Sequence, residues 1–233
     1  ISFYSAVQQT LISHSLSIFT PNKWGEYGGK CLFYSKKSST KIILFTGLGH
    51  FCQLMATLIF GILGLWICAI QFEILDVLKF QWSWMMFLPF LVLIFGFYFK
   101  VIRQKAKSIF ESLKQIKRSK IKCALKWSAF RYIIFAHQFL FLLWIVGAEI
   151  SYMNGLGLIF LVYLTASAIP VFAIADVVVK SSMAITLMSL AGLSTPPVIM
   201  TVFVMWLGNT MLPALIGYFW MWSWQPAFIK SKL

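Results

Sequence analysis

Two short ionisable pairs stand out in a chain that is otherwise strongly apolar. Glu26 is followed four residues later by Lys30, and Asp176 is followed at the same interval by Lys180. An acid and a base at this spacing meet on one face of a helix and can neutralise each other. Charged side chains near hydrocarbon are costly and usually mark a pathway or a substrate site. With only six acids in the chain, two pairs in matching settings need an explanation.

Each pair has a proline upstream and glycines or small residues nearby, and two interpretations are open. In the first, each pair is an interfacial salt bridge that orients a short helix. In the second, which we favour because the feature occurs twice, the pairs line a polar crevice for a charged headgroup or a coupling ion. An anionic lipid phosphate would favour the lysines and the free N–H groups of a broken helix start. The acids could accept protons or meet a cationic headgroup.

The composition restricts the class of protein. Of 233 residues, 60% are hydrophobic and 11% are charged, whereas a soluble domain has roughly 25% charged residues. We therefore predict an all-α polytopic membrane protein with one transmembrane domain over residues 1–233. Because Ile1 falls inside a helix-like segment, we expect a fragment that has lost upstream spans. The net charge of +14 does not predict nucleic-acid binding, because the positive residues cluster at the ends of apolar runs, as in cytoplasmic loops.

The apolar runs predict five membrane spans and two re-entrant segments. The predicted spans are 42–70, 82–99, 127–148, 156–175 and 197–222. The re-entrant candidates are residues 1–35 and 176–195.

The basic stretch 100–126 is expected to be a cytoplasmic loop, together with the C-terminus, because lysine and arginine accumulate on that side. Residues 156–195 would then enter and leave on the outer side as a broken pair, whose turn carries Asp176 and Lys180. Residues 1–35 look similar but leave on the cytoplasmic side. This pattern suggests inverted repeats, a common plan in secondary transporters.

Polar residues inside the predicted spans would support such a path. In 42–70, small and polar residues recur on one helical face, where small ones allow close packing and Gln53 could line a crevice. Arg131 and Gln138 share a face of 127–148, and Arg131 could either snorkel to the cytoplasmic surface or bind a lipid phosphate. In the last span Asn209 could satisfy the backbone carbonyl that Pro213 leaves free.

Four sequence boxes then occur in a fixed order. Residues 20–30 read T-P-N-K-W-G-E-Y-G-G-K, 50–53 read H-F-C-Q, 131–139 read R-Y-I-I-F-A-H-Q-F, and 205–217 read M-W-L-G-N-T-M-L-P-A-L-I-G. Together they resemble the flippase-like membrane domain of bacterial lysylphosphatidylglycerol synthases. One departure is the second pair, where 176–181 read D-V-V-V-K-S and the acid that usually follows the base in that family is absent.

The resemblance implies a multi-span helical fold with re-entrant helices and a lipid-facing cavity in a bacterial plasma membrane. In two-domain relatives this part is thought to move aminoacylated phospholipid between leaflets. The aminoacyl-transferase domain is absent from this sequence, so we expect no lipid synthesis. Because archaeal members of the family are linked to glycan assembly, a lipid-linked substrate is equally compatible.

We therefore predict a non-enzymatic, flippase-like protein with no cofactor and no metal. The residues expected to form its path are Glu26, Lys30, Asp176, Lys180, Gln53, Arg131, Gln138 and Asn209. The expected partner is a membrane phospholipid or lipid-linked substrate and not nucleic acid. A second copy of the chain, or a separate lipid-modifying enzyme, stays open as a protein partner. The alternative functions are a membrane subunit of a lipid- or glycan-modifying enzyme and a non-transporting envelope scaffold.

Overall fold

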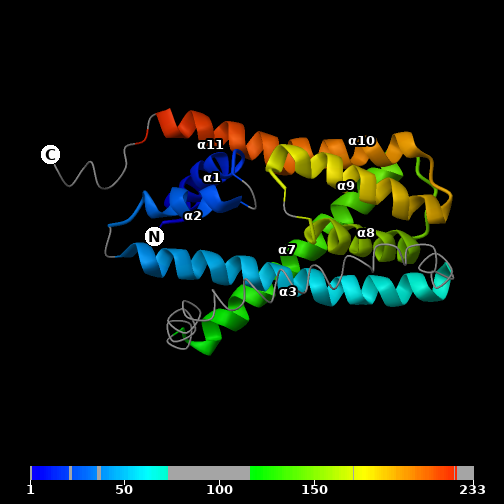
Figure 1. Cartoon of the computed structure of the whole chain (residues 1–233), viewed down its shortest axis with the longest axis horizontal. Coiled ribbons are helices and arrows are strands. Elements are labelled where there is room, and N and C mark those ends of the chain that lie inside the picture. The colour runs from blue at the N-terminus through cyan, green and yellow to red at the C-terminus, as the bar shows by residue number, and fades with distance from the viewer. Residues whose placement is uncertain are drawn as a thin grey trace, which may run out of the picture.

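The computed structural model describes residues 2–20, 23–35, 38–72, 116–169, 171–222 and 224. All regular elements in these ranges are helices (Figure 1), so the predicted all-α class is confirmed. They are α1 (Phe3–Ser17), α2 (Trp24–Cys31), α3 (Ser39–Gln71), α7 (Arg118–Ile145), α8 (Tyr152–Ser167), α9 (Ala173–Met188), η3 (Ser189–Ala191), α10 (Thr195–Trp206), η4 (Leu207–Met211) and α11 (Leu212–Trp222). The segment η4 is a single turn of π-helix that joins α10 to α11.

Four helical stretches in the described part are long and apolar enough to cross a membrane. They are α3, α7, α9 with η3, and α10 through α11. Large apolar side chains stay exposed on them, among them Ile62 and Trp66, each at 64%. Because a soluble protein rarely leaves so large an apolar surface in water, the chain is a multi-pass membrane protein. Three predicted spans fall largely within these helices, and the predicted span 82–99 lies outside the described residues.

The predicted span 156–175 is not one continuous helix. Helix α8 ends at Ser167 and α9 begins at Ala173, and a proline stands at position 170 between them. A proline lacks the N–H that a helix needs and disfavours helical geometry in the preceding residue. The break therefore comes earlier than expected, so Asp176 and Lys180 lie in the first two turns of α9 instead of in the turn.

The basic stretch 100–126 is also different from a simple loop in its described part. Helix α7 begins at Arg118, so 118–126 are helical, and 100–115 lie outside the described residues. Lysine and arginine are good helix formers. A membrane helix such as α7 can therefore begin with basic residues that would lie outside the bilayer.

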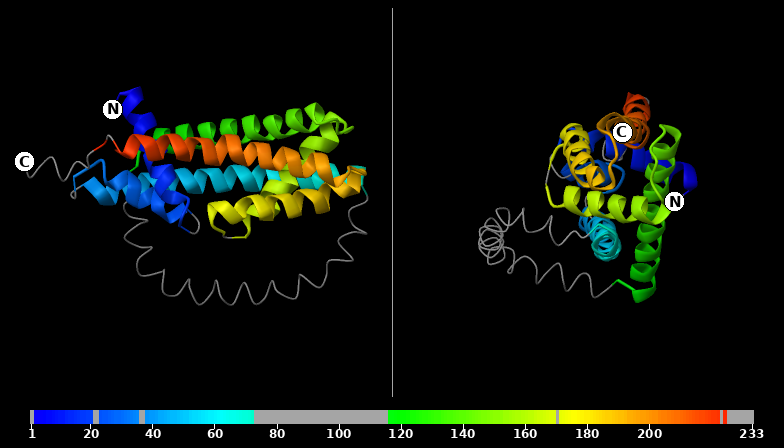
Figure 2. Two further views of the ribbon diagram at one scale, coloured as in Figure 1. Left: turned by 90° about the horizontal axis from the view of Figure 1, so that it is seen from above. Right: turned by 90° about the vertical axis from the view of Figure 1, so that its right-hand side faces the viewer.

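Two helix pairs enter the molecule from opposite ends (Figure 1). Helices α1 and α2 lie toward the end where α3 begins, and α8 and α9 lie toward the end where α3 finishes. In both pairs the break between the helices faces the middle of the long helices, as the view from above also shows (Figure 2). We call these pairs the first hairpin (α1–α2) and the second hairpin (α8–α9).

The two hairpins share local features as well as opposite directions. Helices α1 and α8 have 15 and 16 residues, which is short of the roughly 20 that a complete span needs. Each starts at a serine N-cap: Ser2 accepts a hydrogen bond from the N–H of Ser5, and Ser151 accepts one from the N–H of Asn154. The inverted repeats that the sequence suggested stay a prediction.

Glycines dock each hairpin onto the long helix of the opposite half. A Cβ added at Gly217 of α11 would collide with the backbone carbonyl of Leu11 in α1. A Cβ at Gly64 of α3 would lie 2.8 Å from the carbonyl oxygen of Gly157 in α8. Small residues let membrane helices approach closely, so α1 packs on α11 and α8 packs on α3.

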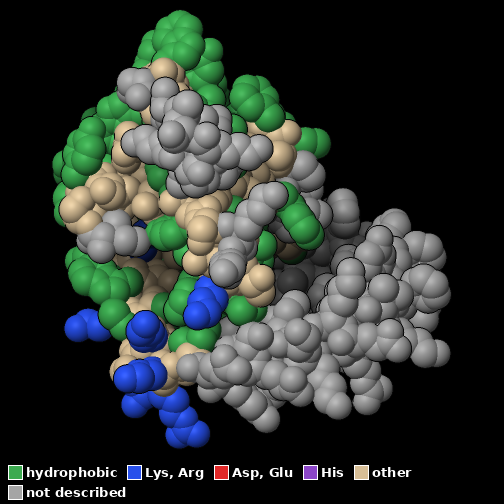
Figure 3. Space-filling model, turned by 90° about the vertical axis from the view of Figure 1, so that its left-hand side faces the viewer, with side chains coloured by type: hydrophobic (Ala, Val, Ile, Leu, Met, Phe, Trp, Pro, Cys, Tyr) green, Lys and Arg blue, Asp and Glu red, His purple; other side chains and the backbone are tan. Residues whose placement is uncertain are grey.

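Positive charge gathers at the end of the molecule where α3 and α7 begin. Figure 3 looks at that end, and lysine and arginine side chains project from its lower part. Lys41 stands in the first turn of α3, and Lys120 and Lys122 stand in the first turns of α7. The other end carries the exposed acid Glu149, which follows α7. The described charges are therefore separated along the long axis.

Candidate functional site

Glycines in α2 hold this short helix against α1. Positions Gly25 and Gly29 have no room for a Cβ, because Leu16 and Ser13 of α1 stand directly against them. The hydroxyl of Thr20 accepts a hydrogen bond of 2.7 Å from the N–H of Gly25, which satisfies one free donor at the start of the helix. The repeated small positions explain the glycine-rich sequence around Glu26.

The first acid–lysine pair forms and also contacts α3. Lys30 Nζ donates to Glu26 Oε1 at 2.6 Å, and His50 Nε2 lies 3.3 Å from Glu26 Oε2. Burial alone would raise the pKa of Glu26, but the contacts from His50 and Lys30 outweigh it and hold that pKa well below its usual range. Glu26 is therefore an anion that links α2 to α3.

The second acid–lysine pair has the same form. Lys180 Nζ donates to Asp176 Oδ2 at 2.5 Å, with 37% and 29% of the two side chains exposed. Asp176 stands in the first turn of α9, where a negative charge is favoured by the helix dipole. Both pairs thus sit in the helix that leads away from the break of its hairpin.

A third basic residue, Lys23, is affected by the acids of both pairs. The pKa of Lys23 is lowered by burial, then by the positive charges of Lys180 and Arg131, while the negative charges of Asp176 and Glu26 oppose the shift. Charges interact appreciably only over short distances when water screens them. Lys23, which stands directly before α2, is therefore influenced by the charges of both residues of the pair in the second hairpin.

Lys23 lies at the surface of the described part of the molecule. Its side chain is exposed to solvent, yet protein atoms surround it densely enough for burial to be the first cause of its lowered pKa. Lys23 is also the one residue other than glycine with a left-handed backbone in the described part, at φ 59°, a conformation that is costly and tends to occur at functional sites.

Arg131 of α7 belongs to the same group. It acts electrostatically on Lys23 and on His14, and Glu26 acts on it in turn. Its guanidinium stands over the ring of Phe135, 5.8 Å from the centroid. The charge of Arg131 thus affects His14 and Lys23, and its role in the site stays a prediction.

The cluster lies within the length of the spanning helices. His50, which contacts Glu26, lies eleven residues after Ser39, the first residue of α3, or roughly 17 Å along the helix axis. Helix α9 then extends away from Asp176 toward the opposite end (Figure 1). We use the name polar cluster for Lys23, Glu26, Lys30, Arg131, Asp176 and Lys180.

Gln138 and Asn209 lie in contact beside a helix defect. Asn209 Nδ2 donates to Gln138 Oε1 at 3.0 Å, which joins α10–α11 to α7. Asn209 stands in the π-turn η4, where the N–H of Leu212 bonds to the carbonyl of Leu207. Pro213 has no N–H to donate to a carbonyl one turn earlier, so the backbone hydrogen bonds change locally from the α-helical to the π-helical spacing. Isolated π-turns in helices are frequent at functional sites.

His14 and Lys23 were not among the residues predicted from the sequence. His14 Nε2 lies 3.2 Å from the carbonyl oxygen of Thr210 in η4, so it connects α1 to the π-turn. Burial and the charge of Lys23 lower the pKa of His14. Lys23 had a sequence signal, because it lies three residues before Glu26 in the same box, whereas His14 had none beyond being polar in an apolar helix.

Gln53 is the predicted site residue that the structure does not join to the others. Within the described ranges its side chain makes no hydrogen bond to another predicted site residue. Its backbone carbonyl accepts a hydrogen bond of 3.1 Å from Thr57 Oγ1. Gln53 lies one turn after His50 on α3, beside the cluster instead of in it.

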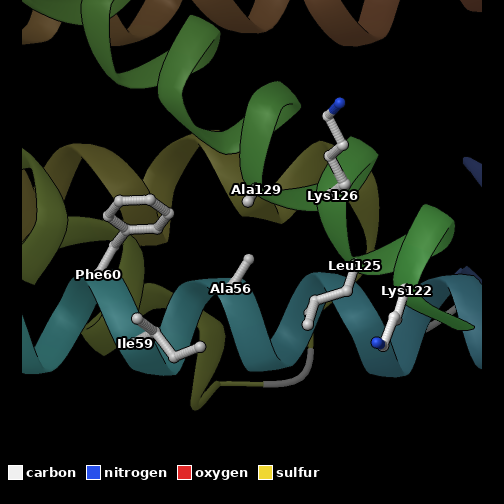
Figure 4. Close-up of a pocket in the computed structure, with 7 residues that line it drawn as sticks. All are labelled: Ala56, Ile59, Phe60, Lys122, Leu125, Lys126 and Ala129. Carbon is white, nitrogen blue, oxygen red and sulfur yellow. The ribbon is translucent and has the colours of Figure 1, made fainter.

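A separate apolar groove lies between α3 and α7 (Figure 4). It has a volume of about 380 Å³ and is lined by Ala56, Ile59, Phe60, Lys122, Leu125, Lys126 and Ala129. None of the eight predicted site residues lines it. In the part of the chain that the structure describes, no three His, Cys, Asp or Glu side chains come together in a way that could hold a metal ion.

The comparisons with known proteins give no family for this chain. No protein-family model matches it, and no curated protein or solved structure does. What the site can do must therefore be argued from its own geometry. That geometry combines paired acids and lysines with two further exposed cations, Lys23 and Arg131, which together suit a charged group that enters from water.

Proposed function

We propose that this chain is a flippase-like membrane protein that binds the headgroup of a phospholipid or lipid-linked substrate and moves it across a bacterial plasma membrane. The observation that supports the proposal is that the charges of Asp176 and Lys180 in the second hairpin act on Lys23 beside the first. Broken helices that meet at a polar site are the usual construction of a transport site.

The cost of charge in a membrane supports this proposal. Ionisable side chains placed within spanning segments are expensive and are retained where they line a path. A structural salt bridge would need one acid and one base, and each hairpin already supplies such a pair of its own. The further cations Lys23 and Arg131 are not explained by a purely structural role.

The sequence resemblance adds independent support. Its first box contains Lys23, Glu26 and Lys30, its third contains Arg131 and Gln138, and its fourth contains Asn209. These residues come from distant parts of the chain, and Gln138 of the third box lies in contact with Asn209 of the fourth. A match to the lysylphosphatidylglycerol synthase membrane domain would account for that shared location.

The basic end gives the proposed orientation. The starts of α3 and α7 carry Lys41, Arg118, Lys120 and Lys122, and positive residues favour the cytoplasmic side. We therefore place this end, with the described end of α11 beside it (Figure 1), on the cytoplasmic side. The first hairpin then enters from the cytoplasm and the second from outside.

A translocation assay tests the proposal. The full-length protein is reconstituted in liposomes with a labelled anionic or aminoacylated phospholipid, and an impermeant quencher reports the label that stays outside. Glu26→Gln and Asp176→Asn should insert normally and lower the translocation rate at least about tenfold, a loss typical of removing one charged contact. Glu149→Gln is the matched control, because Glu149 is an exposed acid outside the cluster. Folded protein that moves none of the lipids would refute the proposal.

A further inference from the structure

The apolar groove between α3 and α7 has one apolar end and one cationic end. Phe60 of α3 lies at the first end, and Lys122 of α7 lies at the second (Figure 4). Apart from Lys126, the other side chains that line the groove are all apolar: Ala56, Ile59, Leu125 and Ala129. Its volume of about 380 Å³ falls within the roughly 300–1,000 Å³ of small-ligand sites. This lining suits a molecule with an apolar chain and a negatively charged end.

The groove exists because small residues face each other on the two helices. Ala129 of α7 lies opposite Ala56 of α3 (Figure 4), and their short side chains leave a gap between the helices. The larger side chains of Ile59 and Leu125 form walls and are 59% and 38% exposed. The chains of membrane lipids are as apolar as leucine. An exposed apolar gap on two spanning helices is therefore a place where a lipid chain fits without a desolvation cost.

The two lysines of the groove lie one helical turn apart and are free to bind an anion. Both are exposed, and neither forms an ion pair with a described residue. Long lysine side chains cover apolar surface with their stems and keep the amine at a polar level. Lys126 does this, because its stem lines the groove while its amine projects away from α3 (Figure 4). Lys122 is therefore the first cation at the end of the groove, and Lys126 adds positive charge beside it.

The cationic end of the groove lies toward the basic end of the molecule. Lys120 Nζ lies 5.5 Å from the ring centroid of Phe45, which is roughly 9 Å along α3 from its first residue, whereas Ala56 is roughly 26 Å along it. The 33 residues of α3 extend for roughly 50 Å, about 20 Å more than the hydrocarbon core. Lys41 in the first turn of α3 favours placing this excess at the basic end. The start of α7 therefore lies near the lipid headgroups, and the groove extends from it into the hydrocarbon.

We propose that the groove binds an anionic phospholipid of the leaflet at the basic end, with one acyl chain between α3 and α7 and the phosphate at Lys122 and Lys126. The inference goes beyond the proposed function, because this lipid lies apart from the polar cluster and is a structural ligand, not the cargo. Charge complementarity selects the occupant. A neutral lipid would fill the gap but leave both lysines without a counter-charge, whereas each basic residue near an anionic lipid surface adds favourable free energy.

Lipid quenching at Cys123 tests this inference at the groove itself. Cys123 is exposed and follows Lys122, so a fluorophore attached to it reports the lipids beside the groove. Cys31→Ser removes the other thiol that is not buried, since Cys52 and Cys68 are buried. The labelled full-length protein is reconstituted in mixed bilayers of phosphatidylglycerol and phosphatidylcholine. Brominated acyl chains, which quench at short range, are carried by one lipid in the first series and by the other in the second, and the two series give the relative affinity.

Single substitutions separate a specific site from a general attraction to the basic end. The wild type should prefer phosphatidylglycerol at least about fivefold, and Lys122→Gln should lower the preference about fivefold, the contribution of one basic residue near an anionic lipid surface. Lys126→Gln should have a smaller effect. Lys41→Gln is the matched control, because Lys41 is an exposed lysine at the same end that does not line the groove. Ala129→Leu narrows the groove and should reduce quenching by both lipids.

The outcomes separate this inference from its alternatives and from the proposed function. Equal quenching by the two lipids in the wild type, or equal losses in Lys122→Gln and Lys41→Gln, would overturn the anionic site. Unchanged quenching in Ala129→Leu would also overturn it, and would mean that another segment of this chain or a second copy fills the groove. Glu26→Gln and Asp176→Asn should leave the preference unchanged. A protein that keeps the preference but moves no lipid would support the groove site and refute transport.

Discussion

The positive charge of Lys180 in the second hairpin lowers the pKa of Lys23 beside the first, after the larger effect of burial. Two like charges rarely stay together at a protein interior without a reason, because their repulsion lowers the stability of the fold. The acids Glu26 and Asp176 relieve part of that repulsion, and a bound anion would relieve more. The charges of Lys23 and Lys180 therefore favour an anionic substrate for the proposed site.

Removing the charge of Lys23 should stabilise the empty protein. The pKa of Lys23 is lowered, first by burial and then by the charges of Lys180 and Arg131. Below the pKa of an ordinary lysine, the charge on Lys23 therefore lowers the free energy of unfolding of the protein. Lys23→Asn should raise the thermal unfolding midpoint without lipid and lose part of the further rise that phosphatidylglycerol gives the wild type. A lower midpoint without lipid would mean that Lys23 has a structural role.

The affinity for an anionic lipid should fall at high pH. A bound phosphate would raise the pKa of Lys23. Lipid binding is therefore strongest at pH values below the lowered pKa that Lys23 has in the lipid-free protein, and it weakens as the pH rises through that pKa. Lys180 and Asp176 of α9, Arg131 of α7, and Glu26 and His14 also face this lysine. Titration of phosphatidylglycerol affinity against pH should show this alkaline loss in the wild type and not in Lys23→Asn. Identical profiles would assign the loss to another group.

The docking of the second hairpin should depend on Gly64. A Cβ there would lie 2.7 Å from Phe160 and 2.8 Å from the carbonyl oxygen of Gly157, and such overpacking typically costs about 1–3 kcal/mol. Gly64→Ala should therefore lower the thermal midpoint in detergent. Gly49→Ala on the same helix is the control, because nothing lies within 4 Å of its Cβ position, and it should be neutral or stabilising. Equal midpoints for the two variants would argue against the packing of α8 on α3.

The contact between Gln138 and Asn209 should be energetically coupled. Their hydrogen bond of 3.0 Å joins α7 to the π-turn, and such bonds between membrane helices contribute about 0.6 kcal/mol on average. A double-mutant cycle of Gln138→Ala and Asn209→Ala, measured by unfolding in mixed micelles, should give a coupling of that order. Strictly additive effects would show that the bond adds no stability.

Local features of the site could be predicted from the sequence. The four-residue spacing of Glu26 and Lys30 is enough to bring them together, because neighbours on a helix face are fixed by helix geometry alone. The same holds for Asp176 and Lys180, and apolar run length located α3 and the last span. Each of these predictions depends only on residues near one another in the chain.

The meeting of the hairpins could not be predicted in the same way. The electrostatic influence of the second pair on Lys23 joins residues more than 150 positions apart, and it depends on how the helices pack. Two other contacts are also tertiary interactions: His50 with Glu26, and His14 with the carbonyl of Thr210. Pro170 marked a break in the chain, but sequence alone placed that break several residues too late.

The account is tested most directly by the initial rate of lipid translocation in liposomes for the wild type, Glu26→Gln, Asp176→Asn and the double variant. If the two hairpins form one path, each single variant should lose at least about tenfold, and the double variant should be no worse than the poorer single one, because residues that act as a unit are not additive. A single variant at the wild-type rate, or losses that multiply in the double variant, would contradict a single shared path.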